Sequence, residues 1–120
     1  MVKRPKLLMT ALCFLLAVGE VPALAHAMLE HASPSAGDVL RTSPKTVTLS
    51  YTEALEPAFS HITVTDAAGH DVTAGPSTAD GTTMSVTLRP LAPGLYNVKW
   101  QALSVDTHRT SGAFSFAVVR

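Results

Sequence analysis

The feature that most constrains the fold is an alternation of apolar and polar residues that recurs from residue 47 to the end of the chain. Five runs show it, at residues 47–51, 61–65, 83–88, 96–101 and 114–118. Because successive side chains of a strand point to opposite faces, each run predicts a β-strand with one buried face. Turn-forming residues separate the runs, and Asp80-Gly81 between two of them is a typical hairpin signal.

The strand pattern predicts an all-β domain. About seven short strands with frequent turns are typical of a sandwich of two antiparallel sheets. Trp100, Phe114 and Phe116 are the large aromatic side chains on the apolar faces, so we expect them to anchor the core. Met84 lies on an apolar strand face and is expected to fill the core as well.

The first 25 residues have the features of a secretory signal peptide. Lys3, Arg4 and Lys6 precede an apolar run at 7–18, and Ala23-Leu24-Ala25 provides the small-x-small pattern of a cleavage site. Cleavage after Ala25 makes His26 the first residue of the mature protein. We therefore expect residues 1–25 to be a signal peptide, residues 26–120 to form one small domain, and the product to be periplasmic.

Composition excludes several classes of function. The chain has nine basic and nine acidic residues, and three of the basic ones lie in the signal segment, so nothing indicates a nucleic-acid partner. No second apolar stretch approaches the roughly 18 residues of a membrane span. The single cysteine, Cys13, also lies in the signal segment. The mature chain is therefore expected to have no disulfide, no cysteine zinc site and no cysteine nucleophile.

Three residues are candidate metal ligands. A free N-terminal His26 would offer an α-amine and an imidazole in one chelating unit. Asp106 and His108 lie two residues apart, so they point to the same side if the backbone is extended. Nitrogen and carboxylate ligands without sulfur suit Cu(II) better than Cu(I). Asp106 either binds the metal directly or orients an imidazole.

Taken together, these elements resemble the CopC family of periplasmic copper-resistance proteins. The resemblance spans the mature chain, and no single element in it is specific alone. It is carried by His26-Ala27, Leu29, Ser33-Pro34, Gly37, Pro44, the run 47–51, Glu53, Leu91-x-Pro93-Gly94-x-Tyr96-x-Val98-x-Trp100, Ser104-Val105-Asp106-Thr107-His108, and Gly112 with Phe116 and Val118.

The resemblance implies a fold, a site and a role. The fold would be a seven-stranded Greek-key, Ig-like (cupredoxin-like) β-sandwich. One Cu(II) per mature chain would be held by the amine and imidazole of His26, by His108 and by Asp106. Glu53 matches a carboxylate near the metal, with a solvated strand end as the equally weighted alternative. The role would be that of a non-enzymatic copper carrier or buffer in resistance or homeostasis, with an inner-membrane transporter of the CopD type as partner.

One departure from the family concerns Cu(I). Some members carry a methionine-rich loop for Cu(I), whereas the corresponding stretch here, residues 65–73, has no methionine and only His70 as a soft-to-intermediate ligand. We therefore expect no high-affinity Cu(I) site. His31 and His61 have no place in the motif, and His61 is expected to be exposed.

Two other functions compete with the carrier hypothesis. A copper mono-oxygenase also uses an N-terminal histidine, but the added carboxylate would favour the oxidised metal, and the aromatic residues Tyr51, Tyr96 and Trp100 fall on inward strand faces. A metal-free adhesion or structural sandwich is the third possibility. Copper titration distinguishes the last from the other two.

Overall fold

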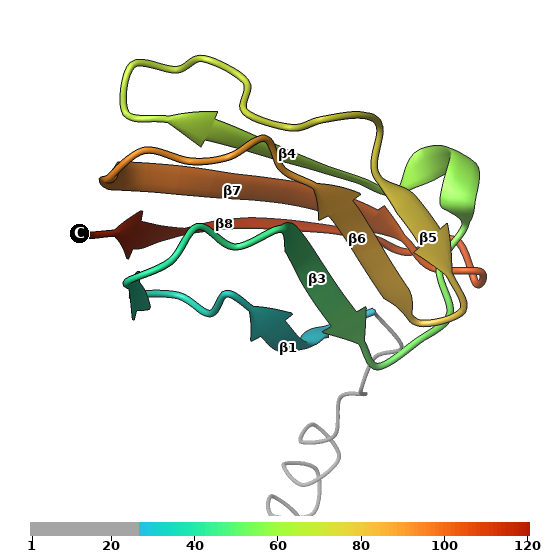
Figure 1. The fold of residues 1–120 in the computed structure, drawn as a ribbon. Coiled ribbons are helices and arrows are strands. Elements are labelled where there is room, and N and C mark those ends of the chain that lie inside the picture. Colours follow the sequence, from blue (N-terminus) through green and yellow to red (C-terminus); the bar gives the residue numbers. More distant parts are fainter. Residues whose placement is uncertain (1–26) are drawn as a thin grey trace, which may run out of the picture.

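The computed structural model describes residues 27–120 and shows two four-stranded β-sheets stacked on each other (Figure 1). The predicted signal peptide 1–25 and His26 lie outside the described residues. The first sheet has the order β1-β3-β6-β5 and the second β2-β8-β7-β4. The strands are β1 (Leu29–Ser33), β2 (Val39–Leu40), β3 (Thr46–Tyr51), β4 (His61–Asp66), β5 (Thr78–Asp80), β6 (Thr83–Thr87), β7 (Gly94–Leu103) and β8 (Arg109–Val118), with a 3-10 turn, η2 (Pro57–Phe59), before β4.

The prediction of an all-β sandwich is confirmed. Within residues 27–120 there are eight strands rather than seven, and β1, β2 and β5 coincide with none of the five alternating runs. Neighbouring strands run antiparallel, except that β2 pairs with β8 in parallel. The Asp80-Gly81 hairpin forms between β5 and β6, where Gly81 has the positive φ of 63° that the turn requires.

The apolar faces of the alternating runs meet between the sheets. Met84 is fully buried, as predicted, and Phe116 is 1% exposed. Trp100 and Phe114 are partly buried and pack against the edge of this core. The buried hydrophobic residues are Ala27, Val47, Leu49, Tyr51, Leu55, Ile62, Val64, Met84, Val86, Leu88, Leu91, Tyr96, Val98, Ala102, Phe116 and Val118. In residues 27–120, no helix has the length and apolar character needed to cross a membrane.

Gly112 makes room for the only tryptophan. The two residues are cross-strand partners on β7 and β8, and the Trp100 ring also meets Tyr51 edge-on, with 5.2 Å between ring centroids. A Cβ at position 112 would lie 2.6 Å from Trp100 Cζ2. A side chain here therefore requires the indole to move.

We expect Gly112→Ala to destabilise the fold by about 1–3 kcal/mol, the usual cost of overpacking. The ring is rigid and is packed against Tyr51, so it has no small adjustment that relieves the contact. Thermal unfolding followed by tryptophan fluorescence measures the effect. Gly94→Ala is the matched control, because a Cβ there has no neighbour closer than 3.9 Å. Equal midpoints for the two variants would contradict the packing argument.

Candidate metal centre

The candidate ligands Asp106 and His108 lie in the short loop that joins β7 to β8. Ser104 N donates to His108 O over 2.9 Å, and Thr107 N donates to Ser104 O over 2.8 Å. The three residues between Ser104 and His108 thus form a tight hairpin loop whose last residue, Thr107, has a φ of 73°. A β-branched residue in this left-handed region costs on the order of 1–3 kcal/mol, so the surrounding hydrogen bonds must hold the loop in place.

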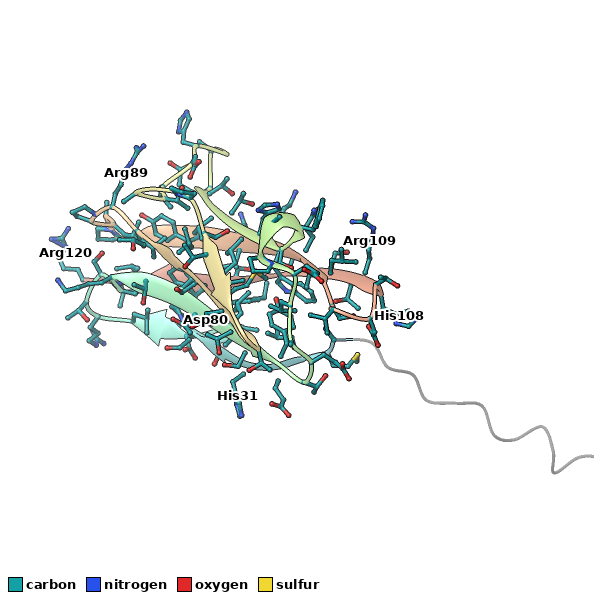
Figure 2. All side chains as sticks on the ribbon, turned by 90° about the vertical axis from the view of Figure 1, so that its right-hand side faces the viewer. His31, Asp80, Arg89, His108, Arg109 and Arg120 are labelled. Carbon is teal, nitrogen blue, oxygen red and sulfur yellow. The ribbon has the colours of Figure 1, made fainter. Side chains whose placement is uncertain are left out.

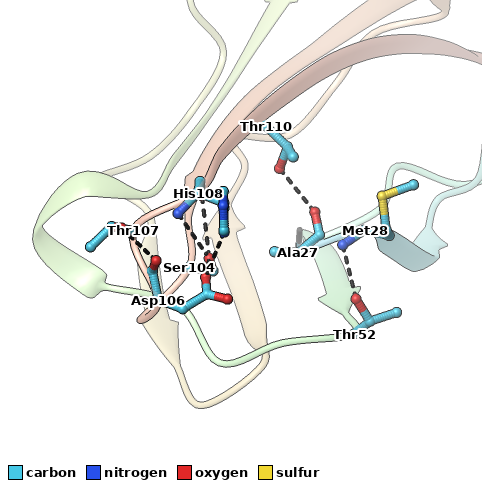
Figure 3. Close-up of polar contacts among 8 residues, drawn as sticks. All are labelled: Ala27, Met28, Thr52, Ser104, Asp106, Thr107, His108 and Thr110. Carbon is cyan, nitrogen blue, oxygen red and sulfur yellow. Dashed lines mark hydrogen bonds and ion pairs between the residues drawn. The ribbon is translucent and has the colours of Figure 1, made fainter. Parts of the chain in front are cut away.

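The loop brings the carboxylate and the imidazole into contact (Figure 3). His108 Nδ1 lies 3.2 Å from Asp106 Oδ1. The proximity predicted from an extended chain is therefore present, but its cause is different, because the backbone turns sharply at Thr107. If Nδ1 carries the proton that faces the carboxylate, Nε2 is the nitrogen left for a metal, an arrangement common among metal-binding histidines. Both side chains remain accessible, at 38% exposure for Asp106 and 47% for His108.

Ser104 is the buried polar anchor of the loop. It is fully buried, and its hydroxyl donates to Asp106 Oδ1. Ser104 Oγ also lies 3.3 Å from the amide nitrogen of His108. The hydrogen bond from Ser104, followed by the contact with His108, holds the pKa of the Asp106 carboxyl below its usual value, although partial desolvation opposes this. The carboxylate is therefore kept ionised, as a metal ligand or an imidazole partner must be.

We expect Ser104→Ala to raise the pKa of Asp106 in the metal-free protein. A carboxyl whose pKa is lowered by folding contributes stability above its unfolded pKa, and this contribution is lost as the pH falls through the folded pKa. The difference in stability between the wild type and Ser104→Ala should therefore shrink as the pH is lowered through the acidic range. Titration of the Asp106 side-chain carbon by NMR measures the pKa directly. Ser111→Ala is an exposed control on β8. An unchanged Asp106 pKa in Ser104→Ala would show that the hydroxyl does not stabilise the anion.

The beginning of the described chain lies beside this loop. Ala27 is fully buried, and its carbonyl accepts a hydrogen bond of 2.9 Å from Thr110 Oγ1, two residues after His108 (Figure 3). On the other side, Met28 N donates to Thr52 Oγ1 over 2.9 Å, and Thr52 N donates to Met28 O over 2.9 Å. Residues separated by some 80 positions in the sequence thus meet at one end of the sandwich. His26, the remaining predicted ligand, precedes the described residues.

Glu53 lies in the segment that runs beside the loop. Its neighbour Ala54 accepts a hydrogen bond of 3.0 Å from Val105 N, and Glu53 itself is partly exposed. Among residues 27–120, however, no three His, Cys, Asp or Glu side chains are grouped so as to hold a metal ion. The loop between β7 and β8 therefore supplies one imidazole and one carboxylate, those of His108 and Asp106.

None of the other histidines in residues 27–120 forms a three-ligand group with Asp106 and His108. His31 is exposed on β1 and projects from a different part of the molecule from His108 (Figure 2). His61 is exposed, as predicted, and His70 contacts Asp66 at 3.3 Å in the loop after β4. Thr52 and Thr110 were not recognised from the sequence, because their contacts are with the backbone of residues far away in the chain, and no spacing reveals such contacts.

Comparison with known proteins identifies the family. The CopC domain model matches residues 29–119. Copper resistance protein C of Xanthomonas campestris pv. juglandis is 37% identical over 106 residues, which cover 80% of this chain and 82% of that protein. The crystal structure of CopC from Methylosinus trichosporium OB3b has a TM-score of 0.73 and 35% identity, over 78% of this chain and 94% of that one.

A third relative is much longer than this chain. The copper transport protein CutJ of Bacillus subtilis is 29% identical over 98 residues, which cover 78% of this chain but only 18% of that protein. The matched segment is therefore one part of a larger polypeptide in that relative. With the domain match, the sandwich fold and the relatives over most of its length, this chain belongs to the CopC family.

Proposed function

We propose that the mature chain begins at His26 and binds one Cu(II) as a periplasmic copper carrier or buffer. The ligands are the amine and imidazole of His26, the imidazole of His108 and the carboxylate of Asp106, which binds directly or through His108. The observation that carries the proposal is the contact of 3.2 Å between His108 Nδ1 and Asp106 Oδ1 at the end of the sandwich where Ala27 lies. Nitrogen and oxygen ligands of this kind suit Cu(II).

The experiment has two stages. Intact mass of the exported protein determines whether the chain starts at His26. Titration of the metal-free protein with Cu(II) at neutral pH should then give one copper per chain. Its electron paramagnetic resonance spectrum should be that of tetragonal Cu(II), and its optical spectrum should lack the intense absorption band of a copper–thiolate centre. Binding should weaken in acid, because protons compete for imidazoles and for an amine whose ordinary pKa is about 8. Absence of stoichiometric binding would refute the proposal.

A carrier must also release its copper to an acceptor, and the acceptor proposed here is an inner-membrane transporter of the CopD type. The longer relative named a copper transport protein supports this, since a CopC-like segment there is joined to a larger chain. Copper transfer from the loaded protein to membranes that contain such a transporter, compared with membranes that lack it, tests the partnership. Equal transfer to both membranes would exclude a specific acceptor.

Reduction of the bound copper is expected to weaken its retention. Cu(I) prefers sulfur ligands, and residues 26–120 contain no cysteine and only Met28 and Met84 as thioethers. Met84 is fully buried between the sheets, so only the exposed Met28 is accessible to a metal. Anaerobic competition against a Cu(I) chelator, with the same titration of Cu(II) as control, measures the difference. Tight one-to-one retention of Cu(I) would contradict the prediction and favour a mono-oxygenase that cycles between the two states.

A further inference from the structure

The first residues of the described chain do not simply continue strand β1. Leu29 pairs with Tyr51 at the end of β3, and the next step along this ladder places Met28 beside Thr52. There the side-chain oxygen of Thr52 takes the place of a backbone carbonyl and accepts the hydrogen bond from Met28 N. One residue earlier, the carbonyl of Ala27 is bonded to Thr110 on β8, in the opposite sheet. The chain is therefore bonded to both sheets, to the first at Met28 and to the second at Ala27.

Two threonine hydroxyls thus hold the backbone at consecutive residues and from opposite sides (Figure 3). Thr110 is partly buried and lies at the start of β8, two positions after His108. A chain end is normally among the least ordered parts of a domain unless it is tied down. Here it is tied down next to the candidate ligand His108.

We propose that Thr110 and Thr52 are positioning residues that align the N-terminal residue for copper. The inference rests on the proposed function, because it concerns how His26 reaches the metal. An amine and an imidazole on a mobile terminus must lose conformational freedom when they bind, and a terminus that is already held loses less. Neither threonine is proposed as a copper ligand. They act through the backbone of Ala27 and Met28, and Thr110 is the more direct of the two because its bond is to the residue adjacent to His26.

The experiment compares variants of the mature protein that differ by one hydroxyl. Thr110→Val removes the hydrogen bond while keeping the shape of the side chain, and Thr110→Ser keeps the hydroxyl. Thr52→Val and Thr52→Ser form the second pair. Thr46→Val is the matched control, because Thr46 is an exposed threonine at the start of β3, the end remote from Tyr51 and Thr52. Cu(II) affinity, the rate of copper dissociation and the paramagnetic resonance spectrum are measured well below the thermal midpoint of each variant.

We expect Thr110→Val to weaken Cu(II) binding by about three- to tenfold, the equivalent of one lost hydrogen bond, mainly through faster dissociation. A second, less rigid copper species should appear in its spectrum, and Thr110→Ser should restore both properties. Wild-type affinity, dissociation rate and spectrum in Thr110→Val would overturn the inference, while leaving the copper site itself established. Weak binding by both Thr110→Val and Thr110→Ser would also overturn it, because the loss would then follow from packing rather than from the hydroxyl. A wild-type protein that takes up no Cu(II) would refute the proposed function instead.

Discussion

Addition of a single alanine before His26 is expected to lower Cu(II) affinity by at least about 100-fold. The added residue converts the α-amine into an amide, which is not a basic ligand at neutral pH, while the imidazole of His26 remains. Changes to residues that only support metal ligands already cost about 10–100-fold, so the loss of a direct ligand should exceed that range. The uncleaved precursor should behave in the same way.

The fold should tolerate this addition. Ala27 keeps its buried position and its bond to Thr110, so the thermal midpoint of the metal-free protein should stay unchanged. An alanine added after Arg120 is the matched control, since that end of the chain is exposed and lies at the opposite end of the sandwich from His108 (Figure 2). Competition titration against a Cu(II) chelator gives the affinities. Equal affinity in the N-terminally extended and native proteins would exclude the amine as a ligand.

Substitution of His108 should separate binding from folding. The imidazole is 47% exposed and lies in a loop, so His108→Ala removes a proposed ligand with little loss of buried surface. We expect a decrease in Cu(II) affinity of at least about 100-fold with a nearly unchanged thermal midpoint. Calorimetric titration and thermal unfolding of the metal-free protein measure the two quantities.

Trp100→Ala is the opposite case. Truncation of a large aromatic side chain costs about 3–5 kcal/mol, and the partial exposure of Trp100 places it near the lower end. For a domain of this size, about 3 kcal/mol corresponds to a midpoint lowered by about 12–24 °C. Copper affinity per folded molecule should be retained, since the indole packs against Tyr51 and Gly112, which lie on strands and not in the loop. A His108→Ala protein that unfolds but keeps its copper affinity would make His108 a structural residue.

The fold was predictable from local patterns. Alternation identified the strands that carry the core, and Asp80-Gly81 identified the hairpin between β5 and β6, because both signals arise from neighbouring residues. The strands β1, β2 and β5 were less predictable, since β2 and β5 have only two and three residues and the burial of β1 does not alternate. The order of strands in each sheet likewise depends on long-range pairing.

The candidate site was predictable only in part. Asp106 and His108 could be paired from their spacing, but an extended backbone was the wrong reason, because the contact depends on the left-handed conformation of Thr107. Position 107 carries no glycine or asparagine, the residues that normally signal this conformation. The role of Ser104 in holding the carboxylate, and the threonine bonds to Ala27 and Met28, appear only when distant segments are brought together.

The burial of Ala27 at the end of the sandwich has a consequence for maturation. Ala27 fills the end of the core, whereas the residue before it supplies the proposed ligand. Cleavage one residue too late would yield a chain that lacks the histidine and carries its charged amine on Ala27, a fully buried residue. Cleavage two residues too late would remove Ala27 as well, and with it a buried residue of the core. Under the proposed function, cleavage must therefore occur at one peptide bond, because one residue more blocks the amine of His26 and one residue fewer removes the histidine.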